Sequence, residues 1–212
     1  MSSSRPTQPI RLHTVLLSGH GHRVRMFLSM LDLPFEILPV DMATGAHRTP
    51  EYLRKNPFGQ VPVIEDGDVT LFDSNAILVY LAKRYGDSSW LPEDPIGAAT
   101  VQRWLSLAAG QIAYGPCAAR LVNVFDAPLD RDKAHAIAVG LFDVVDPELA
   151  SKPFVAGDHP TIADIAAHTY IAHAPEGGIS LEPYPHIRAW LARVASLPGF
   201  VPMLSTKAGL LA

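Results

Sequence analysis

The strongest local signals in the chain lie in NPFGQVPVIEDGDVTLFDS, residues 56–74. The middle of this stretch predicts a β-hairpin, because two runs of β-forming residues flank the turn-forming Asp66-Gly67-Asp68. Its end predicts a helix start, since the short side chains of Asp73-Ser74 accept hydrogen bonds from the free amide groups of a first helical turn. That helix is expected over 75–85 and ends at Gly86.

Pro62 and its neighbours suggest how this segment binds a ligand. A proline cannot donate to a sheet ladder, so Pro62 belongs at an edge or a turn. If the Val61–Pro62 peptide bond is cis, Val61 presents both its N–H and its C=O, and an extended peptide can pair with it as an added strand. The helix starting at Ser74 offers free amides to a carboxylate, and Asp73 would hold an ammonium group. The segment therefore predicts a peptide-like ligand with a zwitterionic amino-acid end.

Strand and helix signals also alternate toward the N-terminus. Ser18-Gly19-His20-Gly21 breaks the first strand, and the order βαβαββα is complete by residue 86. Four elements are expected before the hairpin, namely a buried strand at 10–17, a helix from Arg23 to Leu33-Pro34, a strand at 35–40 and a short helix near 50–55.

Beyond residue 86 the strand signal disappears. Residues 87–95 have the composition of a linker, rich in serine and proline. Helical periodicity then covers 96–125, 129–149, 162–174 and 184–197. We therefore predict an α/β domain at 10–86, a linker at 87–95 and an all-helical bundle domain at 96–212.

Charge and composition disfavour several classes of protein. The 212 residues carry a formal net charge of −4 and no basic run, whereas a nucleic-acid surface needs a basic stripe. No apolar stretch reaches the ~20 residues that cross a bilayer, and residues 1–9 form a lead-in without the apolar centre of a signal peptide. The one cysteine, Cys117, cannot form an internal disulfide and is expected to be a small buried or interface residue. We expect a cytoplasmic protein that binds neither nucleic acid nor membrane.

Several spaced motifs resemble one protein family. NPFGQVPVIEDGD (56–68), LFDSNAI (71–77) and DMATGAHR (41–48) are similar to the N-terminal half of the cytosolic glutathione transferases, especially the phi class. Ser18 stands five residues before Arg23-Val24, as the phi-type active-site serine stands before its Arg-Val. TIADIAA and LPGF extend the resemblance more weakly through the second half. The chain resembles a bacterial-type member of this family with a phi- or theta-like N-terminal half.

The resemblance implies a thioredoxin-like glutathione-binding domain at 10–86 and an all-helical domain at 96–212. It also implies that the hydroxyl of Ser18 donates to the sulfur of glutathione. A hydroxyl donor and a helix N-terminus both favour the thiolate, which is the nucleophile, and lower the thiol pKa. The remaining implied contacts are Val61 and Pro62 to the cysteinyl backbone, Asp73 and Ser74 to the γ-glutamyl end, and His47, Arg48 and Gln60 to the glycine carboxylate.

Some positions depart from the family pattern. Asp73 replaces the commoner glutamate, which shortens the reach by one methylene, and Arg48 stands where the phi pattern usually has lysine. Asn75 replaces an arginine, so one cationic contact is missing. The segment 18–22 lacks cysteine, so a glutaredoxin-like mixed-disulfide mechanism has no nucleophile there.

Simpler interpretations stay open for individual residues. Ser18 is also a common turn former beside glycines, and His47 also fits an ordinary exposed loop histidine. His20 and His22 form a His-x-His pair, but a structural metal site needs four ligands and no metal is expected. His20 is instead expected to border the substrate opening or to donate a second hydrogen bond to sulfur. Residues 161–164 predict a capping box that serves folding.

The helical half is expected to line the pocket for a second substrate. Leu107, Gln111 and Tyr114 fall on one helical face together with Trp104, for which core packing is expected. In the resembling family, helices of this half face the glutathione site. These three residues and His20 are therefore the candidates for contact with an apolar second substrate.

The resemblance implies a transferase in which the thiolate of bound glutathione attacks a small, largely apolar electrophile. Glutathione is then a co-substrate, with no metal and no tightly bound cofactor, and a homodimer is implied. Two alternatives stay open: glutathione-dependent peroxidase or isomerase activity at the same site, and a non-catalytic glutathione-binding or regulatory protein of the same fold. Detoxification and a dedicated catabolic step are both compatible physiological roles.

Overall fold

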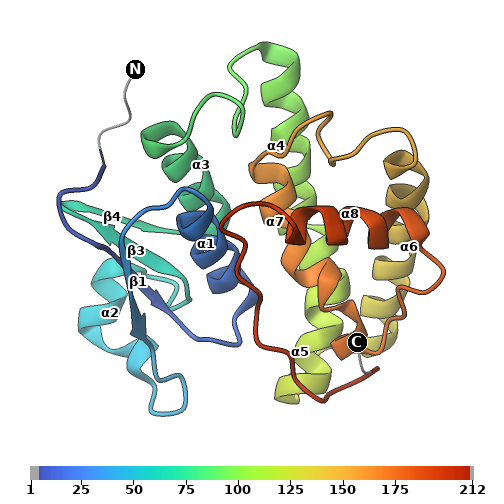
Figure 1. The fold of residues 1–212 in the computed structure, drawn as a ribbon. Coiled ribbons are helices and arrows are strands. Elements are labelled where there is room, and N and C mark those ends of the chain that lie inside the picture. The colour runs from blue at the N-terminus through green and yellow to red at the C-terminus, as the bar shows by residue number, and fades with distance from the viewer. Residues whose placement is uncertain (1–4, 211–212) are drawn as a thin grey trace. The chain divides into compact units, whose positions relative to one another are not determined.

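The structure, a computed structural model, describes residues 5–210, so the first four residues of the expected lead-in and the last two of the expected helical domain lie outside it. The described chain divides into two compact units (Figure 1). Unit 1 comprises the residues up to Leu91 together with Leu197–Met203, and unit 2 comprises Pro92–Ser196 together with the residues from Leu204 onward. The segment Leu197–Met203, which the sequence pattern assigns to the helical domain, thus belongs to unit 1.

Unit 1 is built on a four-stranded mixed sheet. Its strands are β1 (Ile10–Thr14), β2 (Phe35–Pro39), β3 (Val63–Asp66) and β4 (Val69–Phe72), in the spatial order β2-β1-β3-β4. β1 and β2 are parallel, whereas β1 with β3 and β3 with β4 are antiparallel. A parallel pair needs a helical crossover, while the β3–β4 pair needs only a tight turn. Gly67 makes that turn with a φ of 58°, a region that glycine enters without steric cost.

Helices complete unit 1 between and after the strands. They are α1 (Gly19–Met30), the 3-10 turn η1 (Ala46–Arg48), α2 (Pro50–Lys55) and α3 (Ser74–Tyr85). The predicted order βαβαββα is confirmed.

The two faces of the sheet bury different side chains. Residues alternate between the faces along a strand, so Leu12 and Ile64, which pair in register, share one face and are fully buried. α1 and α3 lie over this face (Figure 1). Val63 lies on the other face and forms a small apolar cluster with Val40 and with Tyr52 of α2. The short helix α2 therefore has its own, smaller core.

Unit 2 is helical. Its elements are α4 (Pro95–Ala109), a π-helical segment η2 (Ala113–Cys117), α5 (Ala118–Phe125), α6 (Arg131–Leu149), α7 (Ile162–Ala172), a 3-10 turn η3 (Ala174–Gly177) and α8 (Pro185–Ala195). The continuous helix expected over 96–125 is wrong, because Gly110 has the non-helical angles φ −104° and ψ −104° and a π-helical segment follows. Pro116 inside that segment has no N–H to donate, which disturbs the regular α-helical pattern. Cys117 is buried, as expected.

The start of α7 confirms the predicted capping box. Thr161 Oγ1 accepts from Ala163 N–H at 3.2 Å, and Asp164 Oδ2 accepts from Thr161 N–H at 2.9 Å. Asp164 Oδ1 also accepts from the indole N–H of Trp190 at 2.9 Å, which ties α7 to α8. These contacts give Asp164 a role in folding and leave no role in chemistry to explain. In the described part of the chain, no helix combines the length and apolar character needed to span a bilayer.

Candidate functional site

Four loops of unit 1 leave the sheet at the same end. Thr14, the last residue of β1, pairs with Pro39, the last residue of β2. Val63, the first residue of β3, pairs with His13 of β1 and with Phe72, the last residue of β4. The loops after β1, β2 and β4 and the loop before β3 therefore begin at one end of the sheet. They or the helix starts that follow contain the predicted site residues Ser18, His20, His47, Arg48, Gln60, Val61, Pro62, Asp73 and Ser74.

Ser18 caps the N-terminus of α1. Its backbone is extended, with φ −79° and ψ 116°, and its Oγ accepts from Gly21 N–H at 3.1 Å. The helix therefore begins at Gly19 and not at the expected Arg23. A hydroxyl has one proton and two lone pairs, so Ser18 can accept from Gly21 and still donate its proton to a ligand. Glycine is required at this turn, because a Cβ on Gly21 would lie 1.8 Å from the Thr14 hydroxyl oxygen.

Two side chains of α1 join it to the start of α3. His20 Nδ1 lies 3.2 Å from Ser74 Oγ. The fully buried Arg23 donates from Nη1 to Asn75 Oδ1 at 2.9 Å and to Ser74 Oγ at 3.3 Å. Burial and, to a lesser extent, the charge of Arg23 lower the pKa of His20 to about 3, so its imidazole is neutral near pH 7. The Ser74 hydroxyl is thus held by two side chains of α1.

His20 and His22 do not converge on a common partner. His22 is buried and donates from Nε2 to the carbonyl of Val201 at 2.8 Å, in the segment Leu197–Met203 that joins unit 1. Across residues 5–210, no group of three or more His, Cys, Asp or Glu side chains is arranged to hold a metal ion. The His-x-His pair therefore serves two different neighbours.

Asp73 caps α3 in an unusual backbone conformation. Its Oδ1 accepts from Ala76 N–H at 2.9 Å, and its carbonyl accepts from Ile77 N–H at 2.9 Å. Its φ is +67°, and a non-glycine residue held in such a region costs about 1–3 kcal/mol. Strain of this kind persists where surrounding structure imposes it, often at ligand sites. The side chain is exposed, and its second carboxylate oxygen has no hydrogen bond to the described residues.

Hydrogen bonds fix the backbone directly before Val61, whereas the backbone groups of Val61 itself are not bonded to any described residue. The Val61–Pro62 peptide bond is cis. The carbonyl of the preceding residue, Gln60, accepts two hydrogen bonds, from Tyr52 Oη at 2.9 Å and from Asn56 Nδ2 at 2.8 Å. Within residues 5–210 the backbone N–H and C=O of Val61 form no hydrogen bond. Both groups therefore remain for a ligand.

His47 and Arg48 lie in η1, beside the loop that contains Gln60. Arg48 Nη1 donates to the Phe58 carbonyl at 3.3 Å. Gly59 permits this close approach, since its φ is +60° and a Cβ there would lie 2.9 Å from both Arg48 Nη1 and the His47 carbonyl oxygen. The buried Nδ1 of His47 has no hydrogen-bond partner among the described residues.

The predicted second-substrate residues of the helical half lie in unit 2. Trp104 is 1% exposed and belongs to the core, as expected. Leu107 is half-buried, Gln111 is exposed and Tyr114 is 67% exposed. Tyr114 follows the break at Gly110 and lies in η2, where the spacing differs from that of an α-helix. The single helical face that the prediction requires is therefore interrupted.

Three residues that shape this end of the sheet carried no clear functional signal in the sequence. Arg23 entered only through its spacing from Ser18, yet it is buried and binds Ser74 and Asn75. Tyr52 and Asn56 look like a core residue and a helix end, but their polar atoms both reach the same carbonyl. An Asn before Pro does indicate a turn, whereas no local pattern shows which carbonyl its amide reaches.

The comparisons with known proteins agree with this architecture. Residues 9–83 match the family model for the glutathione S-transferase N-terminal domain, and residues 121–198 match that for the C-terminal domain. Glutathione S-transferase 3 of Zea mays is 35% identical over 208 residues, which cover 91% of each chain.

Solved structures are similar over nearly the whole chain. A glutathione S-transferase from Pseudomonas fluorescens has a TM-score of 0.88 and 33% identity, covering 93% of this chain and 100% of that chain. A glutathione transferase homologue from Drosophila mojavensis with bound glutathione has a TM-score of 0.81 and 28% identity, covering 90% of this chain and 89% of that chain. The fold is that of a two-domain transferase, a thioredoxin-like α/β domain followed by a helical domain. The chain belongs to the glutathione S-transferase family.

Proposed function

We propose that the protein binds glutathione at this end of the sheet, favours its thiolate form and transfers it to a small, largely apolar electrophile. The observation that supports this most directly is that Ser18, Val61 and Asp73-Ser74 all follow or precede strands at one end of the sheet. A tripeptide with a central thiol and a zwitterionic amino-acid end needs a hydroxyl donor, an open backbone and a capped helix start. These are the three kinds of group that the loops supply.

Ser18 is the proposed catalytic residue. Its O–H donates to the sulfur, and the N-terminus of α1 adds a positive dipole end; both stabilise the anion and lower the thiol pKa. The thiol proton leaves to solvent, because His20, with a pKa of about 3, is too weak a base to hold it near pH 7. The thiolate sulfur then forms a bond to the electrophilic carbon. In a substitution the leaving group departs with its bonding electrons, and in an addition the displaced electron pair takes a proton from solvent.

The glutathione backbone and its two ends are assigned to different groups. The free N–H and C=O of Val61, before Pro62, pair with the cysteinyl residue. The free carboxylate oxygen of Asp73 accepts from the ligand ammonium, and the N–H of Ser74, in the first turn of α3, donates to the adjacent carboxylate. The glycine carboxylate is assigned to His47, Arg48 and Gln60 of the neighbouring turn and loop.

The second substrate and the assembly are proposed on the family resemblance. His20 in unit 1 and Leu107, Gln111 and Tyr114 in unit 2 are the candidates for contact with the electrophile. We infer a cytoplasmic homodimer without a tightly bound cofactor or a metal. Light scattering coupled to size exclusion tests the assembly, and a mass near 22.9 kDa for the native particle would contradict the dimer.

The proposed function is tested by titrating the thiol of bound glutathione. Ultraviolet difference absorbance of the thiolate is followed against pH for the wild type and for Ser18→Ala. We expect a thiol pKa well below that of free glutathione in the wild type, and a return toward the free value in the variant. Binding with an unshifted pKa would instead indicate a carrier or regulator. A lowered pKa that survives the substitution would exclude Ser18 as the essential donor.

A further inference from the structure

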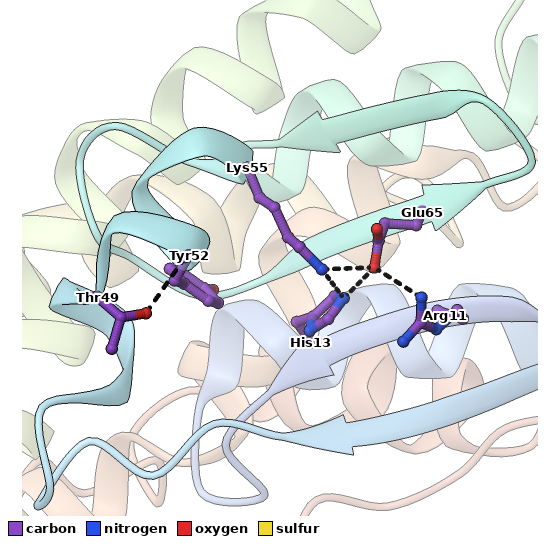
Figure 2. A network of polar contacts seen from close by, with 6 residues as sticks. All are labelled: Arg11, His13, Thr49, Tyr52, Lys55 and Glu65. Carbon is purple, nitrogen blue, oxygen red and sulfur yellow. Dashed lines mark hydrogen bonds and ion pairs between the residues drawn. The ribbon is translucent and has the colours of Figure 1, made fainter.

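An ionic cluster lies on the α2 face of the sheet, outside the residues assigned above (Figure 2). Its centre is Glu65 on β3, whose Oε2 accepts from Nζ of Lys55, the last residue of α2, at 3.0 Å. His13 Nε2 on β1 contacts the same oxygen, and Arg11 Nη1 lies 3.5 Å from it. Arg11 and Glu65 pair in register and His13 is two residues further along β1, so these side chains share one face. One carboxylate is thus surrounded by three basic side chains.

The cluster is largely shielded from solvent. The side chains of Glu65, Lys55 and His13 are 19%, 20% and 11% exposed. Burial acts to raise the pKa of Glu65, but hydrogen bonds and charge from His13 and Lys55 outweigh it, so the pKa is lowered and the group is ionised near pH 7. His13 Nε2 therefore donates to Glu65. Removing one partner from such a cluster leaves the others uncompensated.

The helix that Lys55 ends has few other attachments. α2 has six residues, and an isolated helix shorter than about 12–15 residues is marginal in water. Tyr52 is its one buried residue, in an apolar cluster with Val40 and Val63. The contact between Lys55 and Glu65 therefore helps to fasten the C-terminal end of α2 to the sheet, next to the buried Asn56 that follows it.

The same cluster is linked through Tyr52 to the proposed glutathione contact. The Tyr52 ring packs edge-on against the His13 ring, with centroids 6.3 Å apart and planes at 81°. Its hydroxyl donates to the Gln60 carbonyl, directly before Val61. Contacts thus run without interruption from Glu65 to the backbone that precedes Val61.

We propose that Glu65, with Lys55 and His13, is a positioning residue for glutathione: it holds α2 and, through Tyr52, the backbone of Gln60-Val61. The inference rests on the proposed function and adds to it a group that does not itself touch the substrate. Because the cluster positions the backbone and does not stabilise the sulfur, weakening it raises the KM for glutathione. The kcat at saturating glutathione and the bound thiol pKa stay unchanged.

Lys55→Met and Glu65→Gln test this, with Arg54→Met as the matched control. Arg54 is on the same turn of α2, is exposed and has no ion pair to the described residues. We expect the KM for glutathione to rise about fivefold in the two cluster variants, the size of one ordinary hydrogen bond, because the change reaches the ligand only through the backbone; kcat stays unchanged. Arg54→Met leaves both constants unchanged. Lys55→Arg, which keeps a donor for Glu65, restores most of the affinity.

Tyr52→Phe tests the next step of the chain and leaves the ionic cluster intact. It keeps the ring against His13 and removes only the hydroxyl that donates to Gln60. We expect a rise of about two- to threefold in the KM for glutathione, because Asn56 Nδ2 still donates to the same carbonyl. If the cluster variants do not fold, the KM of Tyr52→Phe for glutathione tests the inference by itself.

Two results would overturn the inference alone. One is a set of folded cluster variants that lose thermal stability but keep the wild-type KM for glutathione, since the cluster would then support only folding. The other is a fall in kcat with a rise in the bound thiol pKa, since the cluster would then act on the chemistry. A wild-type protein that does not bind glutathione would overturn the proposed function and this inference together.

Discussion

The sulfur side and the glycine side of the proposed glutathione site are built differently. The sulfur side consists of the first turns of α1 and α3, two helices of 12 residues whose buried faces belong to the main core of unit 1. The glycine side consists of η1, the six-residue α2 and the loop that contains Gln60, which a few side-chain hydrogen bonds hold. Long helices fix catalytic groups through many contacts, whereas short elements depend on a few. Substitution of the proposed sulfur donor Ser18 should therefore lower kcat. Substitutions at Asp73 and on the glycine side should instead weaken glutathione binding, those on the glycine side by the smaller factor.

The largest effect is expected at Ser18. Ser18→Ala removes the proposed donor to sulfur, and loss of one anion-stabilising donor in other enzymes costs about 100-fold or more in kcat. We expect a loss of kcat of about that size at pH 6.5–7 with little change in the KM for glutathione, measured with a chromogenic electrophile. The loss of kcat should shrink as pH rises, because a growing share of the glutathione is then thiolate without help from Ser18.

Ser18→Thr is the matched control, because it keeps the hydroxyl and the helix cap. Ser18→Ala loses the hydrogen bond from Gly21 N–H and, because alanine is a poor N-cap residue, about 1 kcal/mol of stability. Ser18→Gly loses the same hydrogen bond, but glycine is tolerated at an N-cap, so its loss of stability should be smaller. An alanine variant with wild-type kcat and reduced stability would show that Ser18 serves only as a cap. That result would assign the sulfur side to backbone amides.

The next effect is expected at Asp73, the proposed partner of the ligand ammonium at the start of the sulfur-side helix α3. Asp73→Asn keeps the side-chain oxygen for Ala76 N–H and tolerates a positive φ, but it removes the charge. A hydrogen bond to a charged group is worth about 1.5–3 kcal/mol, so glutathione affinity should fall by about tenfold or more with stability retained. Calorimetric titration with glutathione measures this. An affinity equal to the wild type would remove Asp73 from the ligand site.

Comparing the stability of Asp73→Gly with that of Asp73→Ala tests the backbone strain at this position. It relieves the positive φ of +67° and loses both the cap and the charge. Its stability should therefore change less than that of Asp73→Ala, which keeps the strain and also loses the cap. Equal stability of the two variants would show that the backbone here is unstrained.

A smaller effect is expected at Gly59 on the glycine side. Gly59→Ala places a Cβ 2.9 Å from the Arg48 guanidinium and from the His47 carbonyl, at a φ of +60°. The η1 turn must shift, which we expect to cost about 1–3 kcal/mol of stability and to raise the KM for glutathione a few-fold. Gly45→Ala is the control, since its φ is +78° but nothing lies within 4 Å of its Cβ position. Equal KM values for the two variants would show that backbone strain alone explains the effect.

Local chemistry made the hairpin and most of the local structure of the sulfur side predictable from the sequence. The hairpin around Asp66-Gly67 and the helix start at Asp73-Ser74 depend on residues that are adjacent in the chain, and both were predicted. The helix after Ser18 was predicted to start too late, because the two glycines of its first turn were taken as a break. The break at Gly110 was missed, because apolar spacing on both sides of it resembles one helix.

The glycine side was harder to predict, because its contacts join residues far apart in the chain. The contact between His13 and Glu65 depends on the β1–β3 register, and that between Lys55 and Glu65 depends on where α2 lies over the sheet. Nothing near these residues in the sequence indicates either. The motif in NPFGQVP predicted a ligand-binding loop, whereas the side chains that hold this loop became visible only in the fold.

The smallest effect concerns the stability of the protein at low pH, to which His20 on the sulfur side contributes. Burial lowers the pKa of His20 to about 3, against about 6.5 in an unfolded chain. Between these values the unfolded state binds more protons than the folded state, so His20 destabilises the fold progressively as pH falls below about 6.5. His20→Asn can still reach Ser74 but does not titrate. The variant should therefore lose less free energy of unfolding than the wild type between pH 7 and pH 4, measured by urea denaturation.

His159→Asn is the control for this comparison, since His159 is exposed. His168, whose pKa burial lowers to about 4, destabilises wild type and variants alike in acid and cancels from the difference. Parallel stability curves for the wild type and His20→Asn would mean that His20 protonates as readily in the fold as in the unfolded chain. The first turn of α1 would then be open to water, and its rigidity would no longer distinguish the sulfur side from the glycine side. Curves that diverge only below about pH 6.5 would instead show that His20 stays shielded from water beside Ser74 in the folded protein.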